Sequence, residues 1–136
     1  MARPLRIYAT AVSATGQNRG PWKAVLLAEN SSGKVVSEAI YNLRSQSGAR
    51  GHPADHVEAS LSAMLMALVT GKKHRARDLI VYSDSPAAVD IMNKRRSTTA
   101  DATGTYLQAR ALAHSYRTVS FYYSDRKSTR LNSSHI

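Results

Sequence analysis

Two carboxylates occupy positions in this chain where they could carry out chemistry. Asp84 follows the apolar, β-prone run at residues 79–82 and precedes Ser85 and Pro86, which suit the N-cap and first position of a helix. Asp84 is therefore predicted to lie at the carboxyl end of a buried strand, where open α/β sheets place ligands and catalytic groups. An acid in this position is either a solvated turn residue or a metal ligand.

Glu58 is the second carboxylate, and it falls in the first turn of an amphipathic helix predicted over residues 55–68. The apolar stripe of this helix comprises Val57, Leu61, Met64, Leu65 and Leu68. A local alternative is a capping box, with Asp55 as N-cap and Glu58 three residues later. A helix-borne Glu and a strand-end Asp can also converge on one divalent cation, because Mg²⁺ prefers oxygen ligands. Glu58 and Asp84 are therefore candidate metal ligands, and the local alternatives remain open for both.

The composition favours one soluble domain. The chain has 136 residues, of which 43% are hydrophobic, enough for a modest packed core. It has no cysteine, which excludes a disulfide framework and a thiolate metal site. No apolar run reaches membrane-spanning length, and the first residues lack the apolar segment of a signal peptide. We expect a cytoplasmic monomer without membrane contact.

The charge indicates a polyanionic partner. Nineteen Lys and Arg residues against nine Asp and Glu residues give a net charge of +10, an excess typical of nucleic-acid-binding proteins. Two clusters follow predicted helices, and their candidate nucleic-acid-binding residues are Lys72, Lys73, Arg75, Lys94, Arg95 and Arg96. Cations at a helix C-terminus also complement the helix dipole, so phosphate contact and dipole stabilisation both remain open for each residue.

The order of predicted elements indicates a mixed α/β fold. Alternating or continuous apolar runs predict strands at residues 5–12, 22–28, 34–43, 79–82 and 118–123. Helical patterns cover residues 55–68, 86–95 and 101–115. The first three strands form an antiparallel meander, and helical crossovers join the others. This βββαβααβ order predicts a mixed five-stranded sheet with helices on its faces.

The chain resembles the ribonuclease H family over residues 5–124. The resemblance is carried by Arg6-Ile7-Tyr8-Ala9-Thr10, Gly20-Pro21-Trp22-Lys23-Ala24-Val25-Leu26, Val57-Glu58-Ala59-Ser60-Leu61 and Val81-Tyr82-Ser83-Asp84-Ser85. It implies the ribonuclease H-like strand order 3-2-1-4-5 and an RNA–DNA hybrid as substrate. It also implies two Mg²⁺ or Mn²⁺ ions, about 4 Å apart, that activate water and stabilise the leaving oxygen. Glu58 and Asp84 then correspond to two of the family's four catalytic, metal-binding carboxylates.

One departure from the family pattern affects catalysis directly. The first catalytic Asp of the family corresponds to Thr10, and residues 1–54 contain no Asp at all. A Thr hydroxyl is a neutral and much weaker Mg²⁺ ligand than a carboxylate. This substitution predicts weak metal binding and impaired hydrolysis.

A second departure concerns the end of the chain. The family continues after its fifth strand into a His-bearing loop and a final helix with the last Asp. Here residues 125–136 have no apolar period and resemble a translated sequencing-library adaptor. We therefore expect a ribonuclease H-like domain over residues 1–124, incomplete at its C-terminal end, followed by an artefactual or disordered tail. Without residues 125–136 the excess of basic residues persists.

Three functions remain open at this stage. The first is an endoribonuclease that acts on RNA–DNA hybrids, which the pair of Glu58 and Asp84 favours. The second is an inactive nucleic-acid-binding module on the same fold, which Thr10 favours. The third is another use of the fold, such as polynucleotidyl transfer, because one fold hosts many activities. No histidine has a partner at zinc-site spacing, and His56 is interpreted as a structural residue of a helix first turn.

Overall fold

A computed structural model gives the architecture of the chain, and it describes residues 4–14, 16, 21–43, 53 and 55–125. The strands are β1 (Leu5–Ser13), β2 (Trp22–Glu29), β3 (Val35–Asn42), β4 (Asp78–Ser83) and β5 (Thr118–Tyr123). The helices are α1 (His56–Lys73), α2 (Pro86–Met92) and α3 (Thr103–Ala113). In the described part of the chain, no helix is both long enough and apolar enough to cross a membrane. The predicted tail lies outside the described residues except for Asp125.

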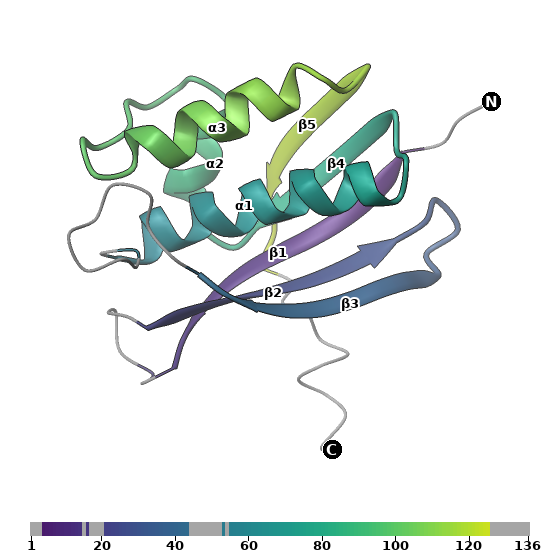
Figure 1. Ribbon diagram of the computed structural model, residues 1–136, viewed down its shortest axis with the longest axis horizontal. Helices are drawn as coiled ribbons and strands as arrows, with labels where there is room; N and C mark the ends of the chain where they lie inside the picture. Colours follow the sequence, from purple (N-terminus) through teal and green to yellow (C-terminus); the bar gives the residue numbers. More distant parts are fainter. Residues whose placement is uncertain (1–3, 15, 17–20, 44–52, 54, 126–136) are drawn as a thin grey trace.

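The five strands form one sheet in the order β3-β2-β1-β4-β5 (Figure 1). Strands β1, β2 and β3 pair antiparallel, and β4 pairs parallel with both β1 and β5. The short β2–β3 connection suits an antiparallel hairpin, whereas the parallel pairs need the helical crossovers that α1, α2 and α3 supply. The predicted fold class and strand order 3-2-1-4-5 are confirmed.

Local capping explains where the helices begin. The Asp55 side chain accepts a hydrogen bond of 2.9 Å from the Glu58 backbone N–H, which confirms the predicted N-cap of α1. The Ser85 hydroxyl accepts one of 3.1 Å from the Ala88 N–H, and Pro86 is the first residue of α2. The C-terminal boundaries were predicted less well. Helix α1 continues to Lys73 rather than 68, and α2 ends at Met92 rather than 95.

Helices α1 and α2 end in the same backbone motif. After α1, the N–H groups of Arg75 and Ala76 donate to the carbonyls of Lys72 and Gly71. After α2, the corresponding bonds run from Lys94 to Ile91 and from Arg95 to Asp90. This is the Schellman pattern, whose left-handed position usually holds Gly. Here Arg75 (φ 59°) and Lys94 (φ 63°) occupy this position. Each predicted basic cluster therefore has one cationic residue in a left-handed conformation that residues other than Gly rarely adopt.

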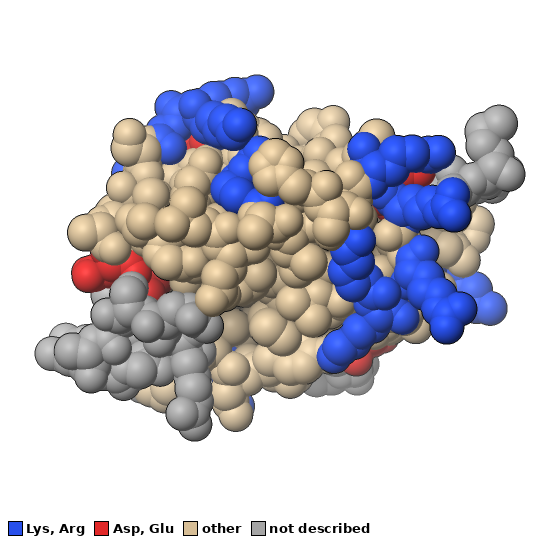
Figure 2. Space-filling model, turned by 45° about the horizontal axis from the view of Figure 1, so that its top comes forward, with Lys and Arg blue, Asp and Glu red and all other residues tan. Residues whose placement is uncertain are grey.

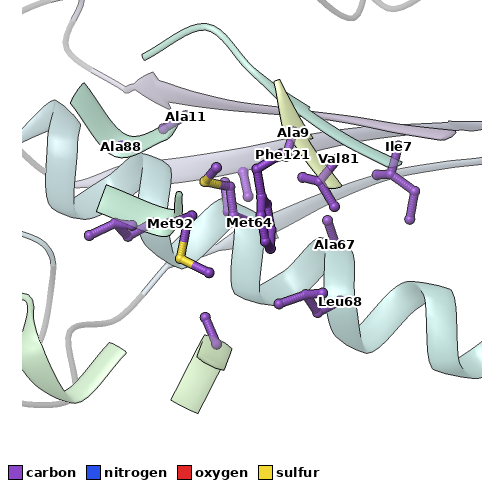
Figure 3. Packing of buried hydrophobic residues seen from close by; sticks show 14 of the residues in the cluster. Ile7, Ala9, Ala11, Met64, Ala67, Leu68, Val81, Ala88, Met92 and Phe121 are labelled. Carbon is purple, nitrogen blue, oxygen red and sulfur yellow. The ribbon is translucent and has the colours of Figure 1, made fainter. Parts of the chain in front are cut away.

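The hydrophobic core lies between one face of the sheet and the three helices. Alternate residues of β1 (Ile7, Ala9 and Ala11) face Met64, Ala67 and Leu68 of α1 (Figure 3). Val81 of β4, Phe121 of β5 and residues Ala88 and Met92 of α2 complete the same cluster, and Ala109 and Ala113 of α3 belong to it. The core therefore fixes the first turn of α1 relative to the ends of β1 and β4.

The opposite sheet face carries a row of tyrosines. Tyr8, Tyr82 and Tyr122 are register partners on β1, β4 and β5. The rings of Tyr8 and Tyr82 stack with centroids 4.6 Å apart, and Tyr82 and Tyr122 lie 6.0 Å apart at a tilt. Such cross-strand aromatic pairs stabilise the parallel half of the sheet.

A buried carboxylate ties the start of β5 to β4. Asp78, 6% exposed, accepts hydrogen bonds from the Arg117 guanidinium and, at 2.6 Å, from the Thr118 hydroxyl. The Arg117 guanidinium is the largest cause that holds the pKa of Asp78 below its usual value, followed by the Thr118 hydroxyl. The ion pair therefore stabilises the folded state only while Asp78 is ionised.

We expect acid to weaken the fold through Asp78. The pKa of Asp78 is lower in the folded chain than in the unfolded chain, where it is about 3.9. Its contribution is therefore complete above that unfolded value and is lost as the pH falls through the folded pKa. Urea unfolding between pH 7 and pH 2 should show this acid-side loss in the wild type, with a smaller pH slope in Asp78→Asn. Asp90→Asn is the control, because Asp90 forms only a long, exposed pair with Arg95 at 3.9 Å. Equal slopes in the wild type and Asp78→Asn would contradict the assignment.

Candidate active site

The candidate site lies where the two central strands end. The last register pair of the parallel β1 and β4 strands is Ala9 with Ser83. Thr10 and Asp84 each follow by one residue, so they lie beside each other at the carboxyl edge of the sheet. Thr10 is 6% exposed, and the Asp84 side chain is 17% exposed. The structure thus places a neutral hydroxyl and a carboxylate on neighbouring strands.

His56, the first residue of α1, faces the Asp84 carboxylate. Its Nε2 lies 3.6 Å from Asp84 Oδ1, a charge contact longer than a hydrogen bond. The imidazole also packs against the Trp22 indole, with ring centroids 5.7 Å apart. The start of α1, the start of β2 and the end of β4 therefore meet at one corner of the domain.

This environment favours the protonated imidazole. Interaction with the Asp84 carboxylate is the largest cause that raises the pKa of His56 above its usual 6.5. Partial burial opposes the shift, and a hydrogen bond to the Ala11 backbone adds to it. Asp84 thus favours the charged form of His56 at this corner of the domain. The prediction of a purely structural role for His56 missed this contact.

Glu58 follows His56 by two residues in the same first turn of α1 and is only 3% exposed. The Glu58 backbone N–H donates to the Asp55 side chain, which is the N-cap bond of the predicted capping box. Because His56 contacts Asp84, the first turn that carries Glu58 lies at the same sheet edge as Asp84. The two predicted carboxylates therefore belong to one corner of the fold.

The described residues do not fit a centre of two divalent ions. One property of a ligand is present, since Asp84 Oδ1 is buried and makes no hydrogen bond. However, no group of three or more His, Asp or Glu side chains in the described ranges could hold a metal ion. Thr10 contributes no charge, and the His56 imidazole, whose protonated form Asp84 favours, lies 3.6 Å from the Asp84 carboxylate. A two-ion centre needs more anionic ligands than this corner offers.

The two predicted basic clusters lie at different ends of the molecule. Lys94, Arg95 and Arg96 border a hollow beside Tyr106 in the first turns of α3, on the side where α1 begins (Figure 1). Residues 72–77 lie where α1 ends, on the opposite side. Figure 2 shows Lys and Arg side chains in separate groups at these two ends. The structure therefore does not bring the predicted nucleic-acid-binding residues together into one surface.

Lys72 differs from the rest of its cluster because its ammonium has partners within the protein. Its Nζ donates to the Ser115 carbonyl at 2.9 Å and lies 4.4 Å from the centre of the Tyr116 ring. These contacts join the end of α1 to the segment that follows α3. Lys72 therefore has a structural role that its sequence context did not indicate.

The strand order, the crossovers and the carboxyl-edge site define a ribonuclease H-like fold. The sequence profile described as reverse transcriptase-like matches residues 14–132, and the chain belongs to this family. A search of curated proteins gives no match.

Solved structures agree with this fold. The N-terminal RNase H domain of a Mycobacterium tuberculosis protein is 23% identical, with a TM-score of 0.72, and the match covers 90% of this chain and 88% of that one. RNase H1 from Halobacterium salinarum is 20% identical, with a TM-score of 0.72 and coverage of 89% and 86%. LC11-RNase H1 in complex with an RNA/DNA hybrid is 15% identical, with a TM-score of 0.66 and coverage of 90% and 86%.

Proposed function

We propose that this chain is a ribonuclease H-like domain that binds RNA–DNA hybrids and hydrolyses them poorly. The observation that carries the proposal is the pair at the carboxyl edge, where Thr10 stands beside Asp84 on the two central strands. The family resemblance assigns a metal-binding carboxylate to the position of Thr10. A hydroxyl there leaves the edge one negative charge short, which weakens attraction of a divalent cation.

Similarity to RNase H1 structures, one of them a complex with an RNA/DNA hybrid, supports nucleic-acid binding. The net charge of +10 supports the same conclusion, since cationic surfaces attract phosphate backbones independently of sequence. We propose that Glu58 and Asp84 retain weak affinity for Mg²⁺ or Mn²⁺. A cytoplasmic location, a monomeric state and the domain limit at residue 124 stay predictions.

The direct test measures cleavage and binding of a labelled RNA–DNA hybrid by the wild type with Mg²⁺ or Mn²⁺. Glu58→Gln and Asp84→Asn are matched variants, because each removes one charge and keeps the side-chain size. We expect hybrid binding that weakens as salt rises, and cleavage rates within about tenfold of each other in all three proteins.

Two results would contradict the proposal. Metal-dependent cleavage by the wild type that falls by about a hundredfold or more in Glu58→Gln would identify an active nuclease. Equal affinity for hybrid and for DNA duplex of the same length would argue against a hybrid-binding site, and would favour another activity of the same fold.

A further inference from the structure

The end of the domain opposite the candidate site carries an exposed cationic surface. We call the segment Lys73, His74, Arg75 and Arg77 the amino-end surface, because it joins the end of α1 to the amino end of β4. All four side chains are exposed. Helix α1 has 18 residues and is therefore about 27 Å long at 1.5 Å per residue, with His56 at its other end. The amino-end surface is thus too far from Asp84 to share one phosphate with it.

Acidic side chains near this surface offset only part of its charge, because Asp78 attracts Arg77 but has Arg117 as its main partner. Asp78 is buried and paired with Arg117, and Glu29 at the end of β2 is only 5% exposed. Figure 2 shows Lys and Arg side chains gathered at this end, with only small areas of Asp and Glu between them. The cations lie within a few residues of one another, well inside the Debye length of about 8–10 Å, so their fields add.

A hollow of about 320 Å³ lies against the same residues. His74, Arg75 and Arg77 line it together with Asn30 and Ser31 of the β2–β3 turn and with Pro4 and Leu5 before and in β1. Its volume equals that of about ten water molecules, enough for a phosphodiester group with part of its hydration. Cations and polar turn residues around one hollow are typical of contacts to a sugar–phosphate backbone.

Arg75 adds a second, independent indication. It occupies the left-handed position of the α1 Schellman motif with φ 59°, where Gly would be unstrained. An arginine in this conformation does not favour the stability of the helix end, and the backbone fixes the direction in which its side chain leaves the helix. Dipole complementation alone does not require it, since Lys72 and Lys73 already occupy the last turn of α1.

The surface fits nucleic acid better than a membrane. A membrane-binding surface combines cations with apolar side chains that enter the lipid interface. The large hydrophobic residues exposed in the described part of the chain are Val12, Val36, Ile40, Leu107, Tyr122 and Tyr123. The amino-end surface contains none of them.

We propose that the amino-end surface is a second nucleic-acid contact, which anchors a phosphate backbone independently of the candidate active site. This inference rests on the proposed function for the identity of the ligand. It adds that binding is divided between two ends of the domain. The anchor recognises phosphate charge, so it does not distinguish RNA–DNA hybrid from DNA duplex.

The test compares two triple variants with the wild type. Lys73→Ser/Arg75→Gly/Arg77→Ser removes three charges, and glycine at position 75 relieves the left-handed strain, which protects the fold. Lys73→Arg/Arg75→Lys/Arg77→Lys keeps the charges and serves as the matched control. Circular dichroism melting curves establish that all three proteins are folded. The affinities for a hybrid and for a DNA duplex are measured across a series of salt concentrations.

We expect the charge-removing triple to bind both duplexes at least about tenfold more weakly at 0.1 M salt, with the charge-preserving triple close to wild type. Its slope of log affinity against log salt should fall by about three, since each lost phosphate contact removes about 0.9. Unchanged affinity and slope in a folded charge-removing triple would overturn the anchor.

Other outcomes separate this inference from the proposed function. The wild type could bind hybrid and DNA duplex equally, while the charge-removing triple binds both more weakly. This result would support the anchor and contradict the hybrid-binding site. If the wild type prefers hybrid and the charge-removing triple binds both duplexes as tightly as the wild type, only the anchor is contradicted. Binding of the wild type to vesicles of anionic phospholipid but to neither duplex would overturn both.

Discussion

Thr10→Asp is expected to create metal-dependent stability in a domain that otherwise responds little to divalent ions. The new carboxylate would lie beside Asp84, one residue past the last pair of β1 and β4, at a position where Thr10 is 6% exposed. Without metal, this like-charge pair should destabilise the fold, because a buried carboxylate next to another raises the cost of ionising both. A divalent cation that binds both would reverse the loss.

The measurement is thermal and urea unfolding with and without Mg²⁺ or Mn²⁺. Metal at about 100 times its dissociation constant adds about 2.7 kcal/mol to the stability of a binding-competent folded state. We expect a rise of this order for Thr10→Asp, little change for the wild type, and some gain in hybrid cleavage by the variant.

Thr10→Asn is the matched control for Thr10→Asp, since it has the size of Asp without the charge. It should show no metal-dependent rise. A wild type stabilised by metal as strongly as Thr10→Asp would show that the hydroxyl of Thr10 does not limit metal binding, and would remove the basis for impaired hydrolysis.

Gly71→Ala is expected to destabilise the domain although alanine favours helices. A Cβ atom at position 71 would overlap the Tyr116 hydroxyl and lie 3.2 Å and 3.3 Å from the two methyl carbons of Leu79. The Tyr116 hydroxyl cannot move away freely, because it donates a hydrogen bond to the Leu68 carbonyl in a site where burial raises the pKa of Tyr116 to about 12. Overpacking of this kind costs about 1–3 kcal/mol, against a gain in helix propensity of about 1 kcal/mol.

A double-mutant cycle with Tyr116→Phe isolates this contact. Tyr116→Phe alone should cost about 1 kcal/mol through the lost hydrogen bond. Once the hydroxyl is absent, Gly71→Ala should cost less than it does in the wild type, so the two changes should couple favourably. Urea unfolding at neutral pH gives the four stabilities. A stabilised Gly71→Ala single variant would contradict the close approach of α1 to Tyr116.

The cycle also bears on function. Gly71 and Leu68 belong to α1, which begins at His56 beside the candidate site and ends at the amino-end surface. Tyr116 contacts the end of α1 through the Leu68 carbonyl and through the Lys72 ammonium above its ring. A shift of Tyr116 would therefore change the end of α1 that adjoins the proposed phosphate anchor, far from the carboxyl edge.

Sequence alone determined the features that depend on near neighbours. Asp55 and Ser85 cap helices because a side chain three residues before an N–H can reach it without any tertiary contact. The strands follow from alternation and apolar runs of six to nine residues, which short-range sterics decide. The strand order follows from the family resemblance, and the sequence itself places the neutral Thr10 at a position where the family has a carboxylate.

Only the tertiary structure decided which of these residues meet. His56 and Asp84 lie far apart in the chain, and packing of α1 on β1 and β4 brings their side chains to 3.6 Å. Helix α1 continues beyond its predicted end, and in its last turn Lys72 donates a hydrogen bond to the Ser115 carbonyl, a tertiary contact that the apolar stripe does not reveal. The length of α1 separates the two basic clusters in space. Their spacing along the chain does not show which side of the molecule each cluster faces.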